Sequence, residues 1–283
     1  MPGDGRKTIL TDLRIKNFML KEKKLFLFDI DGTIAIGDTL YDGSKELLDY
    51  IESIGGKAYY ITNNSTKSNA DYVAKFEKCF GVKTTENQFI TSGFMTKTFL
   101  MDNYCDKKIF VVGTASYVED LRSSGLKVTT EVEEDIALVV VAYDSELNYE
   151  KLSKVCQVLF EKDVPFYATN PDLRCPIDFG FIPDCGAICD MITATTDKKP
   201  VYLGKPNKKV VEMCLLDSGF SKEETIVVGD RLYTDIACGI NAGVDTCVLF
   251  TGEAKKEDMK DTPFKATYEF EDVKTFLSAI LGE

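Results

Sequence analysis

The sequence of 283 residues contains no histidine. This absence excludes a catalytic serine or cysteine with a histidine base, a phosphohistidine intermediate, and zinc or iron held by histidine. Proton transfer in any reaction must therefore fall to aspartate, glutamate, lysine, tyrosine or cysteine side chains.

Long apolar runs and an excess of basic charge are also absent. No stretch approaches the roughly 18 uninterrupted apolar residues that a membrane span needs, and the start MPGDGRKTIL lacks the apolar core of a signal peptide. The formal net charge of -12 disfavours nucleic acid and anionic membranes as partners, because both attract basic surfaces. We expect a cytoplasmic protein that binds neither nucleic acid nor membrane.

Paired cysteine motifs are lacking as well. The nine cysteines are scattered without a CxxC pair, and the nearest approach to one, Cys185 and Cys189 in CGAIC, has no second ligand pair. This distribution indicates reduced thiols in a reducing compartment rather than a disulfide framework or a zinc site.

The chain does contain a regular alternation of apolar strands and helices. Runs such as KLFLFDI, KAYYIT, IALVVVAYD and TIVVGD alternate with helical segments such as SKELLDYIESIG and residues 92–104. Strands of near-continuous Val, Ile and Phe between helices are typical of parallel sheets covered on both faces, so we predict an α/β fold. Because there are too many units for one compact sheet, we expect a second α/β unit inserted in the middle third. Residues 1–24 fit a short amphipathic helix.

Polar side chains follow four of the apolar runs. They are Asp29 and Asp31 after LFLF, Thr62 to Ser65 after KAYYI, Lys205 after VYLG, and Asp230 with Asp235 after TIVVG. Ligands of open α/β sheets bind at the carboxyl ends of the strands. Carboxylates, hydroxyl and amide donors and one lysine are the groups of a magnesium-assisted phosphate site.

The pair Asp29 and Asp31 also has structural interpretations. Asp31 and Gly32 form a DG pair between apolar residues, which is typical of a hairpin turn with solvated carboxylates. A calcium-binding loop is excluded, because it needs glycine where the chain has Ile34 and glutamate where it has Leu40. The hairpin interpretation stays open, and it would not prevent Asp29 from facing a ligand.

The other three strand ends have ordinary interpretations too. TNNS before a helix is typical of a cap, although the same backbone N–H groups can bind an anion. Lys205 could be a solvated lysine at a helix start, and Thr234 or Asp235 could cap a helix. Each interpretation is plausible alone, but their coincidence at four strand ends favours a shared site.

The ordered set DIDGT, ITNNS, LGKP and VGDRLYTDI resembles the haloacid dehalogenase (HAD) superfamily of phosphatases. The spacing is similar to the NagD-like or p-nitrophenylphosphatase subgroup, which carries a large α/β (type C2) cap between the second and third motifs. ATNPD at residues 168–172 is also similar to that subgroup. The resemblance, from residue 25 onward, implies a Rossmann-like parallel-sheet core of residues 1–91 and 198–283. Residues 92–197 would form an inserted α/β cap domain that closes over the site and excludes water.

The resemblance also implies a role for each motif residue. Asp29 would be the nucleophile that forms an aspartyl-phosphate, and Asp31 the general acid and then the general base. Thr62, Asn63 and Lys205 would bind the substrate phosphate, with Asn63 supplying a backbone donor.

The metal site implied by the resemblance uses the remaining carboxylates. Asp29, Asp230 and the carbonyl of Asp31 would bind Mg2+, and Asp235 would orient waters or Lys205 rather than bind the ion directly. Four carboxylates would repel a phosphate dianion, so a divalent cation and a lysine are needed to make the site attractive.

One cap turn departs from the subgroup's usual Pro-Gly-x-Gly. This chain has Pro183, Asp184, Cys185 and Gly186 there. Asp184 and Asp178 would add negative charge near the expected entrance and disfavour highly anionic substrates. The alternative is that both are solvated loop residues.

The sequence therefore predicts a Mg2+-dependent phosphatase that hydrolyses phosphomonoesters of small metabolites. A sugar phosphate, a nucleotide or a glycerol-type phosphate would suit, with p-nitrophenyl phosphate as an artificial substrate. A phosphotransferase or mutase with the same intermediate stays open, and so does a cap that binds a partner while activity is incidental. A receiver-like phosphoacceptor module is a further alternative, although receivers are shorter and need no acid at Asp31. The resemblance suggests homodimers through the cap.

Overall fold

The computed structural model describes residues 19–65, 67–177 and 179–282. The chain divides into two compact units, residues 1–61, 74–84 and 211–283 in the first and residues 62–73 and 85–210 in the second. The α/β class predicted from the alternation is confirmed, because both main sheets are parallel and carry helices. The predicted division into a core and a cap at residues 92–197 stays a prediction. The helix expected in residues 1–24 falls mostly outside the described residues.

The larger sheet has six strands in the order β15-β14-β13-β1-β4-β5. Their bounds are β1 (Leu25–Phe28), β4 (Lys57–Thr62), β5 (Phe89–Thr91), β13 (Thr225–Gly229), β14 (Asp245–Leu249) and β15 (Tyr268–Phe270). β1 is central and fully buried, which explains its unbroken apolar sequence. It runs parallel to β4 and β13, with Phe28 in register with Tyr60 and Val228. The segments after β1 and β13 therefore start at the same edge of the sheet.

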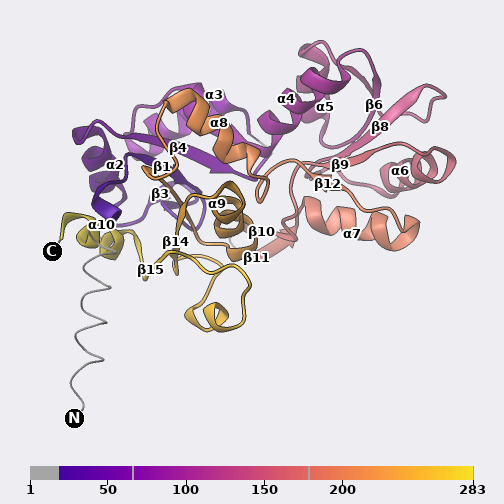
Figure 1. Ribbon diagram of the computed structural model, residues 1–283. Helices are drawn as coiled ribbons and strands as arrows, with labels where there is room; N and C mark the ends of the chain where they lie inside the picture. Colours follow the sequence, from indigo (N-terminus) through magenta and orange to yellow (C-terminus); the bar gives the residue numbers. More distant parts are fainter. Residues whose placement is uncertain (1–18, 66, 178, 283) are drawn as a thin grey trace. The chain divides into compact units, whose positions relative to one another are not determined.

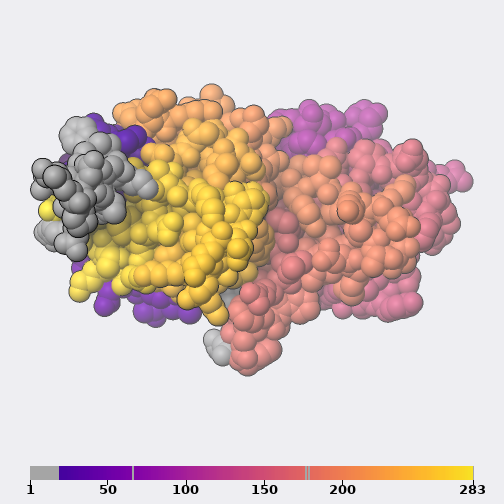
Figure 2. All heavy atoms as spheres, turned by 60° about the horizontal axis from the view of Figure 1, so that its bottom comes forward, coloured from indigo at the N-terminus to yellow at the C-terminus, as the bar shows by residue number. Residues whose placement is uncertain are grey.

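Helical segments lie between these strands along the chain, and one more follows the last strand (Figure 1). They are α2 (Ser44–Ser53), α3 (Asn69–Lys75), α8 (Lys209–Ser218), α9 (Ala237–Ala242), α10 (Val273–Leu281), the π-helical turns η1 (Phe76–Phe80) and η3 (Leu232–Ile236), and the 3-10 turns η2 (Glu86–Gln88) and η4 (Lys256–Lys260). Figure 2 shows the yellow C-terminal residues beside the indigo start of the described chain. There α10 packs on the turn before α2, where a Cβ at Gly43 would lie 3.0 Å from Cα of Lys274. Sequence-distant segments thus complete one unit.

The segment after Asp31 forms a tight turn followed by a short hairpin. The backbone N–H of Gly32 donates to the carbonyl of Ala35 at 2.8 Å. β2 (Ala35–Ile36) then pairs antiparallel with β3 (Thr39–Leu40). The hairpin predicted at this DG pair exists, but its connection lies at Gly37 and Asp38. Asp31 and Gly32 instead belong to the preceding turn.

The second unit is built on a five-stranded parallel sheet in the order β12-β9-β8-β6-β7. Its strands are β6 (Lys108–Val112), β7 (Lys127–Thr129), β8 (Ile136–Val141), β9 (Phe166–Ala168) and β12 (Val201–Tyr202). Side chains alternate between two buried clusters: Phe110 and Val139 pack with one, Ile109 and Leu138 with the other. Helices α6 (Tyr149–Glu161) and α7 (Cys185–Thr196) cover the first face, and α4 (Ser92–Tyr104) and α5 (Ala115–Ser123) the second (Figure 1).

The cap turn that departs from the subgroup begins α7 and follows the antiparallel hairpin β10 (Arg174–Ile177) and β11 (Gly180–Pro183). The carboxylate of Asp184 caps the helix by accepting from the backbone N–H of Cys185, and it also accepts from the Asn170 amide at 3.1 Å. Asp184 is therefore not a merely solvated loop residue. The retained Gly186 is required by space, since a Cβ there would lie 2.2 Å from the carbonyl oxygen of Pro171. Asp178 lies outside the described residues.

No helix in the described part of the chain combines the length and the apolar character that crossing a membrane requires.

Truncation of a central strand residue should show that β1 anchors the first unit. We expect Leu27→Ala to lower the free energy of unfolding by about 2–5 kcal/mol, because Leu27 is fully buried and its loss leaves a cavity. The matched control is Leu216→Ala on α8, where the side chain is 85% exposed. Urea denaturation should separate the two variants; equal midpoints would contradict the central role of β1.

Candidate active site

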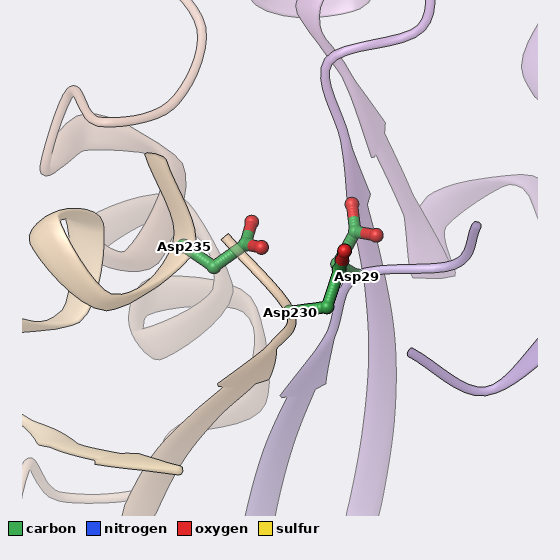
Figure 3. A group of neighbouring side chains, drawn as sticks. All are labelled: Asp29, Asp230 and Asp235. Carbon is green, nitrogen blue, oxygen red and sulfur yellow. The ribbon is translucent and has the colours of Figure 1, made fainter. Parts of the chain in front are cut away.

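Three aspartates lie together in the first unit. Asp29 follows β1, Asp230 follows β13, and Asp235 belongs to the π-helical turn η3. One carboxylate oxygen from each lies within 4.8 Å of the others. Figure 3 shows the side chains of Asp29 and Asp230 rising from neighbouring strand ends, with Asp235 reaching toward them. The structure therefore brings together three of the residues that the sequence assigns to one site.

The parallel pairing of β1 and β13 explains this convergence. The backbone N–H of Asp29 donates to the carbonyl of Val228 at 2.9 Å, so the pairing continues to the aspartate itself. Asp235 reaches the site because the strand end beneath it lacks a side chain. A Cβ at Gly229 would lie 2.2 Å from Cβ of Asp235. The glycine in VGD thus makes room for the third carboxylate.

Asp230 is held in a cradle of two glycines and two donors. A Cβ at Gly252 would lie 2.0 Å from Asp230 Oδ2, and one at Gly32 would lie 2.8 Å from the same atom. The Thr33 hydroxyl donates to Oδ1 at 3.2 Å, and the backbone N–H of Glu253 donates to Oδ2 at 2.7 Å. These contacts fix the orientation of the carboxylate.

The donor set fits a hard divalent cation. Magnesium takes oxygen ligands at about 2.1 Å, so ligands on opposite sides of the ion lie about 4.2 Å apart. The aspartate oxygens all lie within 4.8 Å of one another, so they are close enough to share one ion. Asp29 is 9% exposed, Asp230 2% and Asp235 fully buried, and uncompensated carboxylates so buried would be costly. The group can hold a metal ion, and it includes Asp235 as well as Asp29 and Asp230.

The electrostatic potential around these residues is negative. Burial, followed by the charges of Asp230 and Asp31, raises the pKa of the Tyr41 phenol. The nearby Arg231 is engaged by Glu253, with 3.2 Å between Nε and Oε2. A cation or a cationic side chain would therefore be attracted to this end of the sheet.

Asp31 lies in the turn that starts directly after Ile30. Its side chain is 36% exposed, in contrast to the buried aspartates. Asp31 is not part of the group of three carboxylates. This difference in exposure agrees with the separate role that the resemblance implies for it.

The other predicted site residues lie in the second unit, where Asn63 and Lys205 are joined. The Asn63 side chain accepts from the backbone N–H of Lys205 at 2.9 Å and donates to the Lys205 carbonyl at 3.0 Å. Lys205 is 2% exposed, so the interpretation as a solvated lysine is wrong. Thr62 is the last residue of β4 and accepts from the backbone N–H of Asn64 at 3.1 Å.

Two helix-cap interpretations are also changed by the structure. Ser68, rather than TNNS, accepts from the backbone N–H of Asp71 at the start of α3. Thr234 and Asp235 are both inside the π-helical turn η3. Asp235 accepts from the backbone N–H of Arg231 at 3.0 Å, which orients its carboxylate.

A buried carboxylate that the motifs did not assign supports Asn63. Asp172, the last residue of ATNPD, accepts from the Asn63 amide at 2.7 Å and from the Asn170 amide at 2.9 Å. Gly204 is confined beside them, since a Cβ there would lie 2.6 Å from Asn63 Oδ1. ATNPD includes Asp172, but the spacing of this motif does not indicate a contact with Asn63, which lies 109 positions earlier.

Gly252 and Glu253 are the other residues that the motifs missed. They follow β14, which ends at Leu249. The segment TGE, which follows this fifth strand end, is the sequence signal that indicates them. Its contribution to the site comes from the backbone and from the absence of a side chain.

Comparison with known proteins agrees with this geometry. A family model described as haloacid dehalogenase-like hydrolase matches residues 26–127, and a HAD-hydrolase-like model matches residues 202–276. An acid sugar phosphatase of Staphylococcus haemolyticus is 31% identical over 261 residues, covering 92% of this chain and 98% of the relative. The chain belongs to the haloacid dehalogenase-like hydrolase family. The HAD phosphatase predicted from the motifs is thereby confirmed.

Solved structures place this HAD hydrolase in the expected subgroup. A 4-nitrophenylphosphatase of Thermotoga maritima is 34% identical with a TM-score of 0.83, covering 93% of this chain and 99% of that one. NagD of E. coli is 29% identical with a TM-score of 0.78, covering 89% and 97%. The likeness to NagD and nitrophenylphosphatase structures extends through both units.

Filling the cradle of Asp230 should weaken binding of a divalent cation. We expect Gly252→Ala to raise the dissociation constant for Mg2+ by about 10-fold or more, because the added methyl group must displace the carboxylate. Calorimetric titration measures this constant. The control is Gly93→Ala, where the nearest atom to the new Cβ would lie at 3.6 Å. Equal affinities in both variants would contradict the proposed cradle.

A charge at Asn63 should destabilise the second unit. We expect Asn63→Asp to cost about 2 kcal/mol or more in the free energy of unfolding, because the new carboxylate faces buried Asp172 and loses the amide donor. Asn103→Asp on exposed α4 introduces the same charge and should change stability by less than about 1 kcal/mol. Chemical denaturation compares them; equal stabilities would reject the buried network as a constraint.

Proposed function

We propose that this HAD phosphatase is a Mg2+-dependent phosphomonoesterase that works through an aspartyl-phosphate on Asp29. The observation that most strongly supports this proposal is the group of Asp29, Asp230 and Asp235 in the first unit. Membership of a hydrolase family with phosphatase relatives supports the reaction class. The cation would be held by Asp29, Asp230 and the Asp31 carbonyl, with Asp235 beside it.

The chemistry divides into two displacements at phosphorus. A carboxylate oxygen of Asp29 attacks phosphorus while the bond to the leaving oxygen breaks, and Asp31 gives that oxygen a proton. Asp31 then takes a proton from water, whose oxygen attacks phosphorus and breaks the bond to Asp29. The products are an alcohol and inorganic phosphate, and both aspartates return to their starting states. Bound Mg2+ would supply positive charge that offsets the charge of the phosphoryl group.

Phosphate recognition is proposed for Thr62, Asn63 and Lys205. Lys205 is buried and its backbone is fixed by Asn63 on both sides, which supports a defined position for the ammonium group. Thr62 offers a hydroxyl at a strand end and Asn63 a backbone N–H. A lysine kept out of water binds an anion more strongly than a solvated one.

Phosphorylated small metabolites are the proposed substrates, with sugar phosphates first. This choice is supported by relatives named acid sugar phosphatase, and p-nitrophenyl phosphate by structures named for that activity. A nucleotide or a glycerol-type phosphate are further candidates. Family membership favours hydrolysis over the receiver-like alternative. In the proposed hydrolysis water accepts the phosphoryl group, whereas in a phosphotransferase a second substrate would accept it. A cytoplasmic location and a homodimer through the cap are proposed on the sequence alone.

The nucleophile assignment is tested by Asp29→Asn. We expect the variant to lose p-nitrophenyl phosphate hydrolysis by about 1,000-fold or more, because a neutral amide cannot form the aspartyl-phosphate. EDTA should also abolish wild-type activity, and added Mg2+ should restore it. The matched control is Asp102→Asn on the exposed surface of α4, which should keep full activity.

Two different results would contradict the covalent mechanism and the requirement for a metal ion. Sustained turnover by Asp29→Asn would reject the covalent mechanism. Full turnover in EDTA would reject the requirement for a metal ion.

A further inference from the structure

Lys75 pairs with the predicted proton carrier Asp31. It is the last residue of α3, and its Nζ lies 4.0 Å from Asp31 Oδ1 and 3.9 Å from Asp38 Oδ1. Asp38 lies in the connection between β2 and β3. Among the described residues, no second lysine or arginine lies within 4.0 Å of the Asp31 carboxylate. Lys75 therefore bridges Asp31 and the hairpin that follows it, all within the first unit.

The burial of Lys75 is unusual for its residue type. Its side chain is 10% exposed, whereas lysine is almost never buried unless it is paired. The ammonium group lies 5.5 Å from the ring centroid of Phe80, within the range of a cation–π contact. Phe76 packs on Tyr60 with 4.4 Å between ring centroids. Aromatic residues of η1 therefore lie beside the ammonium group of Lys75 and anchor the turn that follows it.

The distance from Lys75 to Asp31 suits a group that must exchange a proton. At 4.0 Å the contact is an ion pair and not a hydrogen bond. Electrostatic attraction falls slowly with distance, so the ammonium group can hold the carboxylate in place at this range. The ammonium group therefore attracts Asp31 without taking up one of its lone pairs in a hydrogen bond.

We propose that Lys75 is a positioning residue for proton transfer by Asp31. It holds the Asp31 carboxylate and the β2–β3 hairpin in the arrangement that serves the leaving oxygen. This inference rests on the proposed function, and it adds a residue that none of the four motifs contains.

The proposal makes the effect of Lys75 depend on the leaving group. p-Nitrophenolate is a stable anion and leaves with little help from an acid, whereas phenolate is more basic and needs the proton more. A misplaced Asp31 therefore slows phenyl phosphate more than p-nitrophenyl phosphate. Both substrates are aryl esters of similar shape, so binding differences are small.

The test compares kcat/KM for these two substrates at saturating Mg2+. In Lys75→Met, which keeps the stem and removes the charge, we expect a loss of about 10-fold or more on phenyl phosphate and about 3-fold or less on p-nitrophenyl phosphate. Lys75→Arg should restore most of the ratio. Lys78→Met, at an exposed position of η1, is the matched control and should match the wild type.

Two further variants separate positioning from general damage. Asp38→Asn removes the other half of the bridge at a side chain that is 75% exposed, so it should fold and should shift the ratio in the same direction. In an Asp31→Asn background, Lys75→Met should leave the ratio unchanged, because the group it positions is gone.

The outcomes distinguish this inference from the proposed function. Equal losses on both substrates, or a wild-type ratio in both Lys75→Met and Asp38→Asn, would overturn the role of Lys75. Failure of the wild type to hydrolyse either ester would instead overturn the proposed function.

Discussion

Repulsion between carboxylates is the constraint that the first unit must satisfy. Asp29, Asp230 and Asp235 have oxygens within 4.8 Å of one another and little exposure to water. The parallel pairing of β1 with β13 sets two of them side by side, and backbone donors and glycine gaps hold the set in place. The arrangement costs stability in isolation and creates strong affinity for positive charge. The central strands, the glycines and the capping contacts all hold these carboxylates together, at the cost in stability and with the affinity for positive charge just described.

The second unit holds its own charged residue by different means. Lys205 is fixed through its backbone, with the Asn63 amide bonded on both its donor and acceptor sides. Asp172, which lies 109 positions further along the chain, accepts a hydrogen bond from the same amide. The contacts with Asn63 involve the backbone N–H and carbonyl of Lys205 and not its ammonium group. Asp31 is also held without a direct hydrogen bond, because Lys75 stabilises its carboxylate as an ion pair at 4.0 Å.

The sequence predicted the strands, the helix at residues 92–104 and the strand-end aspartates well, because each has a local cause. Buried parallel strands need continuous apolar residues, and DIDGT and VGD mark their ends. The sequence could not predict which side chains are held by distant backbone. The contact of Asp172 with Asn63 and the space beside Gly252 depend on tertiary packing. The hairpin at Gly37 and Asp38 was displaced because the tight turn at Gly32 comes first. The helix α10 was not predicted, although its buried residues Val273, Phe276 and Ile280 follow helical spacing.

The bond between Asn63 and Asp172 bears on how such enzymes can be recombined. The two residues stand 109 positions apart, one just after β4 and the other in the middle of the chain. A chimera that exchanged residues 92–197 alone with those of a relative would replace the carboxylate that accepts from the Asn63 amide. The compact unit that contains both residues is larger than that range, because it comprises residues 62–73 and 85–210. An exchange that preserves the contact between Asn63 and Asp172 therefore has to include the segment that begins at Thr62.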